Sequence, residues 1–245
     1  MMNYSTVYFY EDQYCVRSIV DEEEKLKAYQ LRHEVFCQSL EWVPPNPNGL
    51  ETDGYDPFSM LLGVFSTQEE LLGTFRVLPS DRTFMLESEF ASLIAPDYRV
   101  RKDADTAEIT RFTTAPGLWE RGISPAQISK LLYKGMYQWS LVNCVRFLYV
   151  VVEKRFWRAL VISGYPYEPI GPIKALPPAE AESVAAILDW EKFRLQNKAK
   201  RATFLNWMMT LQPDLVPWPE QWHGLGSRNA VFPKYYARET SPSVR

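Results

Sequence analysis

One short segment limits the possible folds of this chain more than any other. Residues 145–153, VRFLYVVVE, are almost all apolar, and several are β-branched. A strand with one face in water alternates apolar and polar residues, whereas a continuous apolar run is typical of a strand covered on both faces. We therefore expect residues 145–153 to form a central strand of a sheet that carries helices on both sides.

The segment before this strand predicts a helix with a well-marked start. Ser124 is a favourable N-cap, Pro125 suits the first helical position, and Gln127 can close a capping box. Apolar side chains then follow at helical spacing, at Ile128, Leu131, Leu132, Met136 and Trp139.

Other segments predict shorter strands and further helices. Aromatic and β-branched runs predict two early strands (STVYFY and YCVRSIV), a hairpin (SMLLGVFS and LLGTFRVLP) and a further strand (AEITRFTTA). Helices are expected at 22–40, behind Asp21 and Glu24, and at 154–163, before Gly164. Residues 177–211 are also helical in pattern, in one or two pieces. This order of elements predicts an α/β three-layer sandwich with a mixed central sheet.

Composition and charge exclude several classes of protein. The 245 residues suffice for one large domain or two small ones, and 27 basic against 30 acidic side chains argue against a nucleic-acid binder. The N-terminus lacks a signal-peptide pattern, and no window approaches the roughly 18 apolar residues of a membrane span, so we expect a cytoplasmic protein. The three cysteines are expected to be reduced thiols, and the two histidines offer little for Ser-His-Asp catalysis.

The segment NGLETDGYD, residues 48–56, gathers three carboxylates that need a cation. Neither glycine, placed sixth in a calcium-binding loop, puts acids at the first and twelfth positions, so no metal is expected. The chain has no Walker A loop and no GxGxxG turn. The remaining cations are a substrate or the arginines Arg32, Arg76 and Arg111, which lie in otherwise apolar segments. Glu108 and Arg111 would face opposite sides of a strand unless a bulge intervenes.

The residues around these charges resemble a known family. LRHEVFCQSLEW, NGLETDGYD, GTFRVLPS, FMLESEF and EITRF occur in the order and at the spacing found in LuxI-type acyl-homoserine-lactone synthases. The resemblance covers residues 28–116 and continues more weakly to residue 172. Eight residues stand where the family's motif residues stand: Arg32, Phe36, Trp42, Asp53, Asp56, Arg76, Glu108 and Arg111. The chain departs from the family in a proline-rich stretch before the acids, in Thr110 for the more usual serine, and in a longer tail.

The resemblance implies an N-acetyltransferase-like (GNAT-like) domain over residues 1–212, with residues 213–245 as an extension of unknown role. It implies acyl transfer to the amine of S-adenosylmethionine, followed by lactonisation and release of methylthioadenosine, with no permanently bound cofactor. The residues implied to bind S-adenosylmethionine are Arg32, Phe36, Trp42, Asp53, Asp56, Arg76, Arg111 and Phe112. Those expected to act in catalysis are Glu108 as the base, Asp53 as the second candidate, and Arg111. Glu51 is expected only to shape its loop.

The acyl donor implied by the resemblance is a phosphopantetheine thioester on an acyl carrier protein, or an acyl-CoA. TAPGLWERGISP lacks the RxxGxG/A-type loop with which acetyl-CoA-dependent relatives hold pyrophosphate, which favours the carrier protein. The basic candidates for docking an acidic carrier are Lys130, Lys134, Arg194, Lys198, Lys200 and Arg201. The candidates for the acyl pocket are Met136, Leu148, Val150 and Trp157, and valine at position 150 favours an unsubstituted acyl chain.

Two other functions stay open on the sequence. One is an N-acyl amino acid synthase of the same fold, which would acylate an amino acid without releasing methylthioadenosine. The other is a non-catalytic module that binds S-adenosylmethionine or an acyl carrier.

Overall fold

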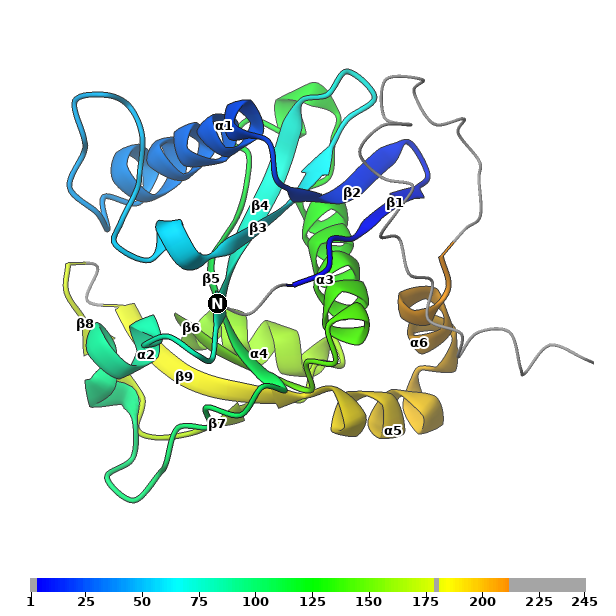
Figure 1. The fold of residues 1–245 in the computed structure, drawn as a ribbon. Helices are drawn as coiled ribbons and strands as arrows, with labels where there is room; N and C mark the ends of the chain where they lie inside the picture. The colour runs from blue at the N-terminus through cyan, green and yellow to red at the C-terminus, as the bar shows by residue number, and fades with distance from the viewer. Residues whose placement is uncertain (1–3, 179–180, 212–245) are drawn as a thin grey trace, which may run out of the picture.

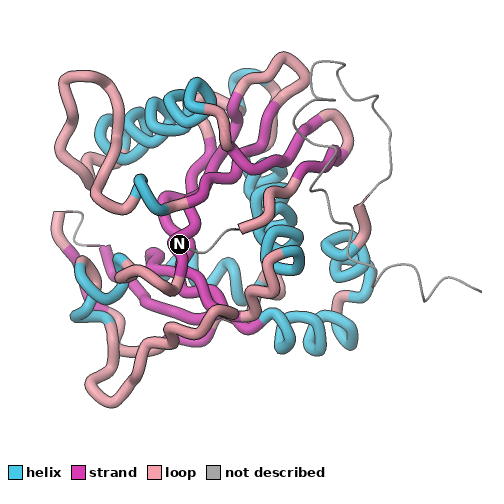
Figure 2. Tube along the Cα trace, viewed as in Figure 1, coloured by secondary structure: helices cyan, strands magenta, loops and turns pink. Residues whose placement is uncertain are grey.

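The structure is a computed structural model that describes residues 4–178 and 181–211 (Figures 1 and 2). In this part of the chain, nine strands form one sheet in the order β1-β2-β3-β4-β5-β6-β9-β7, and β8 also pairs with β9. The strands are β1 (Tyr8–Glu11), β2 (Tyr14–Ile19), β3 (Met60–Phe65), β4 (Leu71–Pro79), β5 (Thr106–Thr114), β6 (Phe147–Glu153), β7 (Glu168–Pro169), β8 (Lys174–Leu176) and β9 (Ala181–Asp189). Neighbouring strands are antiparallel except β5 and β6, which run parallel.

Helices cover both faces of this sheet (Figure 1). They are α1 (Glu22–Arg32), α2 (Met85–Ser88), α3 (Pro125–Val142), α4 (Lys154–Ile162), α5 (Trp190–Lys200) and α6 (Ala202–Met209). Successive side chains of a strand point to opposite faces, and in β3 Leu62 packs in the large core with α3 while Leu61 packs with α1. The predicted three-layer α/β sandwich with a mixed sheet is therefore confirmed.

Strand β6 lies between β5 and β9 and is buried on both faces, as the sequence predicts. Leu148 belongs to the core with α3, and Tyr149 belongs to the cluster with α2. Pairing between β5 and β6 ends at Ile109 and Val150, although β5 continues to Thr114 and β6 to Glu153. The two strands separate beyond this point, so their facing backbone groups are not paired with each other.

A β-bulge in β5 decides which of its side chains share a face. Thr110 pairs with Arg76 and Thr113 pairs with Thr74, so two residues of β5 oppose one of β4. Arg111 lies in this bulge with a φ of 54°, a left-handed value that is uncommon for a residue other than glycine. The extra residue brings Arg111 to the same face as Glu108. Their contacts with Met85 show this shared face, since Glu108 accepts from the Met85 backbone N–H and Arg111 lies against its sulfur.

The prediction of helix throughout residues 177–211 is wrong in its first part. Ala181–Asp189 forms β9, and only the later residues form α5 and α6. The three alanines and Glu182 of β9 favour helix locally, but pairing with β6 satisfies the backbone groups on the second edge of that strand. The same pairing buries Val184 and Leu188 completely.

Helix ends also differ in part from the prediction. Asp21 caps α1 as expected, but α1 ends at Arg32 and a π-helix, His33–Ser39, follows it. Ser124 is the N-cap of α3, yet the predicted capping box is not formed, because the Ser124 carbonyl accepts from the Gln127 N–H at 3.0 Å.

The predicted extension, residues 213–245, lies outside the described residues. Within the described ranges, no helix combines the length and apolar character needed to cross a bilayer.

Candidate functional site

Six buried or half-buried charges meet on the face of the sheet that carries α1 and α2. The cations come from regular elements, one from the last turn of α1, one from β4 and one from the bulge of β5. The anions all come from the loop before β3. The six residues, which we call the charge circuit, are Arg32, Arg76, Arg111, Glu51, Asp53 and Asp56.

Each arginine of the charge circuit joins two acids. Arg32 donates to Glu51 through Nε and to Asp56 through Nη1, the latter at 2.7 Å. Arg76 donates through Nη1 to Asp53 at 2.5 Å and to Asp56 at 2.8 Å.

Arg111 closes the circuit. Its Nη2 donates to Glu51 at 2.8 Å and to Asp53 at 3.0 Å, so every acid of the circuit also contacts two arginines. The positive charge that the acid-rich loop requires is therefore supplied within the chain. In the described part of the chain, no group of three or more His, Cys, Asp or Glu side chains is placed to hold a metal ion.

The charge circuit has a buried side and one exposed edge. Arg32 and Arg76 expose none of their side-chain surface and Glu51 exposes 1%, whereas Arg111 exposes 14% and Asp53 exposes 21%. Buried charges are tolerated only when they are paired, which explains the reciprocal contacts. A ligand would reach the circuit at Asp53 and Arg111.

The arginines keep the circuit acids ionised. Burial alone would raise the pKa of Glu51, but the hydrogen bonds and charges of Arg111 and Arg32 outweigh burial and lower it. Burial would likewise raise the pKa of Asp53, but the hydrogen bonds and charges of Arg76 and Arg111 outweigh burial and lower it. The pKa of Asp56 is lowered against burial mainly by Arg32.

The expectation that Glu51 only shapes its loop is wrong. Glu51 is the most buried acid of the circuit and joins Arg32 to Arg111. A count of charges in the sequence points to it, because three arginines in apolar segments need three acids and the segment NGLETDGYD holds three, Glu51 among them. Met85 was also missed: its sulfur lies 3.0 Å from Nη2 of Arg76 and 3.7 Å from Nη1 of Arg111.

Glu108 lies beside the circuit but is separate from it. Its side chain is fully buried and accepts hydrogen bonds from the backbone N–H groups of Met85, at 2.7 Å, and Leu86, at 2.9 Å. Burial raises the pKa of Glu108 to about 8, although these two N–H groups act in the opposite direction. A carboxyl group with this pKa exchanges a proton near neutral pH.

Two aromatic residues flank the exposed edge of the circuit. The Phe36 ring lies 5.6 Å from the guanidinium carbon of Arg111, and the Phe36 and Trp42 ring centroids are 6.2 Å apart. The prediction that Phe112 joins this group is wrong. The bulge turns Phe112 to the other face of the sheet, where its ring lies 5.0 Å from that of Tyr133 on α3 and 6.3 Å from that of Phe156 on α4.

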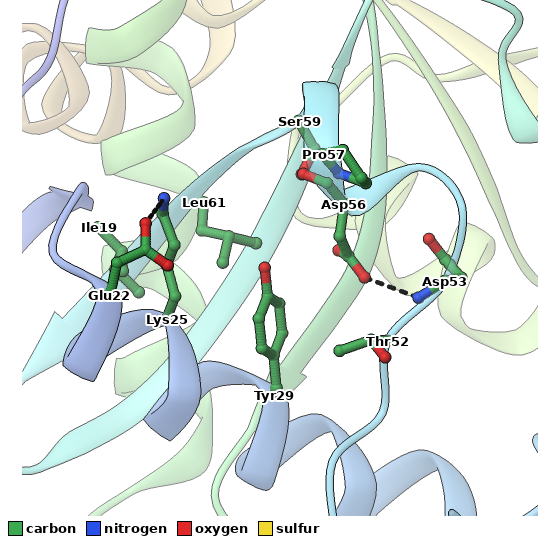
Figure 3. Close-up of a pocket in the computed structure, with 10 residues that line it drawn as sticks. All are labelled: Ile19, Glu22, Lys25, Tyr29, Thr52, Asp53, Asp56, Pro57, Ser59 and Leu61. Carbon is green, nitrogen blue, oxygen red and sulfur yellow. Dashed lines mark hydrogen bonds and ion pairs between the residues drawn. The ribbon is translucent and has the colours of Figure 1, made fainter.

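A cavity of about 490 Å³ reaches the circuit from the side of α1 (Figure 3). The described residues that line it are Ile19, Glu22, Lys25, Tyr29, Thr52, Asp53, Asp56, Pro57, Ser59 and Leu61. The Tyr29 hydroxyl group points into the space between Leu61 and Asp56 (Figure 3). Phe36 and Trp42 stand outside this set, and Phe36 instead lies beside Arg111.

The residues predicted to form an acyl pocket lie together in the core on the α3 side. Met136, Leu148 and Val150 are buried there, and Trp157 packs against them while its Nε1 donates to the Tyr167 carbonyl at 3.0 Å. Val150 is the last residue of β6 that pairs with β5, and Leu148 lies two residues before it. Their role in acyl binding stays a prediction.

The basic residues predicted to dock a carrier fall into two groups. The prediction for Lys134 is wrong, because this side chain is fully buried and its ammonium pairs with Glu11 at 2.5 Å. Arg201 is half-buried and donates to the Ile162 carbonyl at 2.7 Å. The exposed candidates are Lys130 on α3 and Arg194, Lys198 and Lys200 on α5.

Solved structures with this fold are known. The AHL synthase LasI matches with a TM-score of 0.64 and 19% identity, over 72% of this chain and 89% of that one. TofI, in a ternary complex with an inhibitor and MTA, matches with a TM-score of 0.64 and 20% identity, over 82% of this chain and 98% of that one. These similarities show an N-acetyltransferase-like fold.

Relatives and a family description complete the comparison. An acyl-homoserine-lactone synthase of Aliivibrio fischeri is 29% identical over 120 residues, which cover 49% of this chain but only 62% of that protein. The Vibrio anguillarum enzyme of the same name is 29% identical over 171 residues, covering 68% of this chain and 86% of that protein. The family described as autoinducer synthase matches residues 2–197. The chain therefore belongs to the autoinducer synthase family.

Proposed function

We propose that this chain is an acyl-homoserine-lactone synthase that acylates S-adenosylmethionine and releases methylthioadenosine. The observation that carries the proposal is the exposed edge of the charge circuit, where Asp53 and Arg111 form an ion pair beside Phe36 and Trp42. S-adenosylmethionine presents an ammonium, a carboxylate and a sulfonium, and these residues supply a partner for each.

The ammonium and carboxylate of the substrate match the exposed ion pair. Asp53 accepts from the ammonium and Arg111 donates to the carboxylate, so the two groups of the substrate replace one contact of 3.0 Å within the protein. Arg76 and Glu51 hold Asp53 and Arg111 from the buried side and keep the arrangement neutral. The sulfonium then lies against Phe36 and Trp42, a cation–π contact of about 0.5 to 2 kcal/mol.

The amine must lose a proton before it attacks. Glu108 takes this proton, through a water molecule or after a local movement of α2, because its carboxyl group is fully buried. The neutral amine nitrogen attacks the thioester carbonyl carbon, and the intermediate then breaks its carbon–sulfur bond. The phosphopantetheine sulfur leaves as a thiol that carries the second proton of the nitrogen. The substrate carboxylate oxygen then attacks its own γ-carbon, which breaks the carbon–sulfur bond and releases methylthioadenosine. Backbone N–H groups where β5 and β6 separate serve the oxyanion.

The acyl chain enters the core at the same separation of strands. Met136, Leu148, Val150 and Trp157 are the proposed lining. The hydroxyl-free side chain of Val150 suits an unsubstituted chain. Phe112, with Phe156 beside it on this face, is a further proposed contact of the chain.

The donor is a thioester on an acidic acyl carrier protein, with acyl-CoA as the alternative. Lys130 and the exposed basic residues of α5 are the proposed contacts. Helix α4, which begins directly after β6, adds the exposed side chains of Arg155 and Arg158. Complementary charge raises the rate of encounter more than the affinity.

One incubation separates this function from its rivals. The protein is mixed with S-adenosylmethionine and an acyl-carrier or acyl-CoA donor, and methylthioadenosine and acyl products are measured by mass spectrometry. We expect methylthioadenosine and an acyl-homoserine lactone in equal amounts. An N-acyl amino acid without methylthioadenosine identifies the amino acid synthase, and stabilisation by S-adenosylmethionine without any product identifies a binding module.

A further inference from the structure

The helix that carries Arg32 changes its hydrogen-bond pattern directly after that residue. Residues His33–Ser39 form a π-helix, and the Leu40 N–H donates to the Val35 carbonyl at 2.9 Å, across five residues rather than four. Well under 1% of residues in globular proteins are in π-helices, and the short π-segments that occur are frequent at functional sites. A seven-residue π-helix beside the charge circuit therefore needs an explanation.

The π-helical hydrogen-bond pattern leaves the Phe36 carbonyl free to accept hydrogen bonds from outside the helix. In an α-helix the Leu40 N–H would donate to the Phe36 carbonyl, four residues before it. Here that carbonyl instead accepts from the N–H groups of Trp42, at 2.9 Å, and Val43, at 3.1 Å. Phe36 and Trp42 are thereby joined through the backbone as well as through their rings.

The turn between them depends on a residue in an unusual conformation. Glu41 has a φ of 54°, in the left-handed region that favours glycine, and its side chain is exposed. This conformation reverses the chain, so that Trp42 returns to the Phe36 carbonyl. Position 41 is therefore distinguished by its backbone conformation, while its exposed carboxylate can be replaced in a test.

We propose that the π-helix His33–Ser39 and the left-handed turn at Glu41 are the positioning element that holds Phe36 and Trp42 as one aromatic wall beside Arg111. The inference rests on the proposed function, because it assumes that Phe36 and Trp42 contact the sulfonium of S-adenosylmethionine. It places the affinity for S-adenosylmethionine partly under the control of residues that do not touch that substrate.

Two substitutions of Glu41 test this directly. Both Glu41→Gly and Glu41→Pro remove the same exposed carboxylate, but glycine accepts a positive φ and proline does not. We expect Glu41→Gly to keep the KM for S-adenosylmethionine within about twofold of wild type, and Glu41→Pro to raise it about tenfold or more. The KM for the acyl donor should change in neither variant. Equal KM values in two folded variants would overturn the proposal.

A deletion tests the π register itself. Removing Gln38, whose side chain is exposed, shortens the segment by the one residue that distinguishes a π-turn from an α-turn. Its matched control is Gln38→Ala, which keeps the register. We expect the deletion to raise the KM for S-adenosylmethionine about tenfold and the control to behave as wild type. A deletion variant that folds and keeps its KM would refute the role of the register.

Failure of the inference and failure of the proposed function give different results. If the wild type releases no methylthioadenosine, the proposed function fails. The positioning element is then tested by calorimetric binding of S-adenosylmethionine to wild type, Glu41→Gly and Glu41→Pro, with unfolding midpoints measured in parallel. Weaker binding by the proline variant alone supports the inference, and equal binding by all three overturns it.

Discussion

The molecule buries opposite charges on both faces of its sheet, and the two groups are built differently. On the α1 side, the six residues of the charge circuit leave Asp53 and Arg111 partly exposed. On the α3 side, Lys134 and Glu11 expose 1% and 4% of their side chains, and Glu11 also accepts from Nε1 of Trp207 at 2.7 Å. A pair without an exposed edge cannot exchange its partner for a ligand. Burial of charge alone thus marks a structural need, and the exposed edge is what leads us to propose a binding site at the charge circuit.

The largest expected effect is on the exposed edge. Asp53→Asn should lower kcat/KM for S-adenosylmethionine by about 10³-fold. The ammonium of the substrate loses its counter-charge, and the positive charges of Arg76 and Arg111 are no longer fully neutralised. Glu11→Gln is the matched control, a loss of one buried negative charge on the other face, and should stay within about threefold of wild type. Steady-state kinetics at a temperature where both variants are folded decides this. Equal losses of kcat/KM in both variants would contradict the proposal that only the charge circuit binds the substrate.

The pair on the α3 side should respond in stability instead. Glu11→Gln should lower the free energy of unfolding by about 3 kcal/mol, because Lys134 remains buried without its counter-charge. Adding Lys134→Met should restore most of this loss, since a paired charge replaced by an apolar group is often neutral. Urea unfolding of wild type, the single variant and the double variant measures both effects. A double variant as unstable as the single one would contradict this account.

Glu108 is a further buried ionisable group and should control the chemical step. Glu108→Gln should lower kcat by about 10²-fold while KM for S-adenosylmethionine changes less than about threefold. The base must be ionised, so kcat/KM of the wild type should rise with pH up to about 8, the pKa of Glu108. The variant should lose this rise. An unchanged rate in Glu108→Gln would remove Glu108 from the mechanism.

The pH dependence of stability should also differ between Glu108 and the circuit. The pKa of Glu108 is raised from 4.5 to about 8, so between these values the folded state holds a proton that the unfolded state has lost. The free energy of unfolding therefore falls as pH rises through this range. Relative to wild type, Glu108→Gln should gain about 2 kcal/mol between pH 6 and pH 8, measured by urea unfolding. The circuit acids, with lowered pKa values, lose their contribution only in acid. A constant difference would show that Glu108 is ionised throughout.

Much of the fold and of this site was predictable because it follows from local patterns. The apolar run of β6 and the spacing within α3 gave the sheet and its main helix, and charge matching brought the arginines to the acid-rich loop. The rest depends on contacts distant in sequence. The local sequence of residues 181–189 favours a helix, but these residues form a strand because they pair with β6. Phe112 faces α3 only because the bulge at Arg111 shifts the alternation.

Two lysines one turn apart on α3 give the smallest and most local test. The spacing of Lys130 and Lys134 predicts a shared exposed face, but Glu11 and Trp207 cover Lys134. Lys130→Ala should raise KM for an acyl-carrier donor by about threefold, because an exposed ion pair contributes less than about 1 kcal/mol. Lys134→Met should leave this KM unchanged. Added salt should reduce the difference between Lys130→Ala and wild type. If Lys130→Ala has no effect while Arg194→Ala raises the KM, the carrier docks on α5 and not on α3.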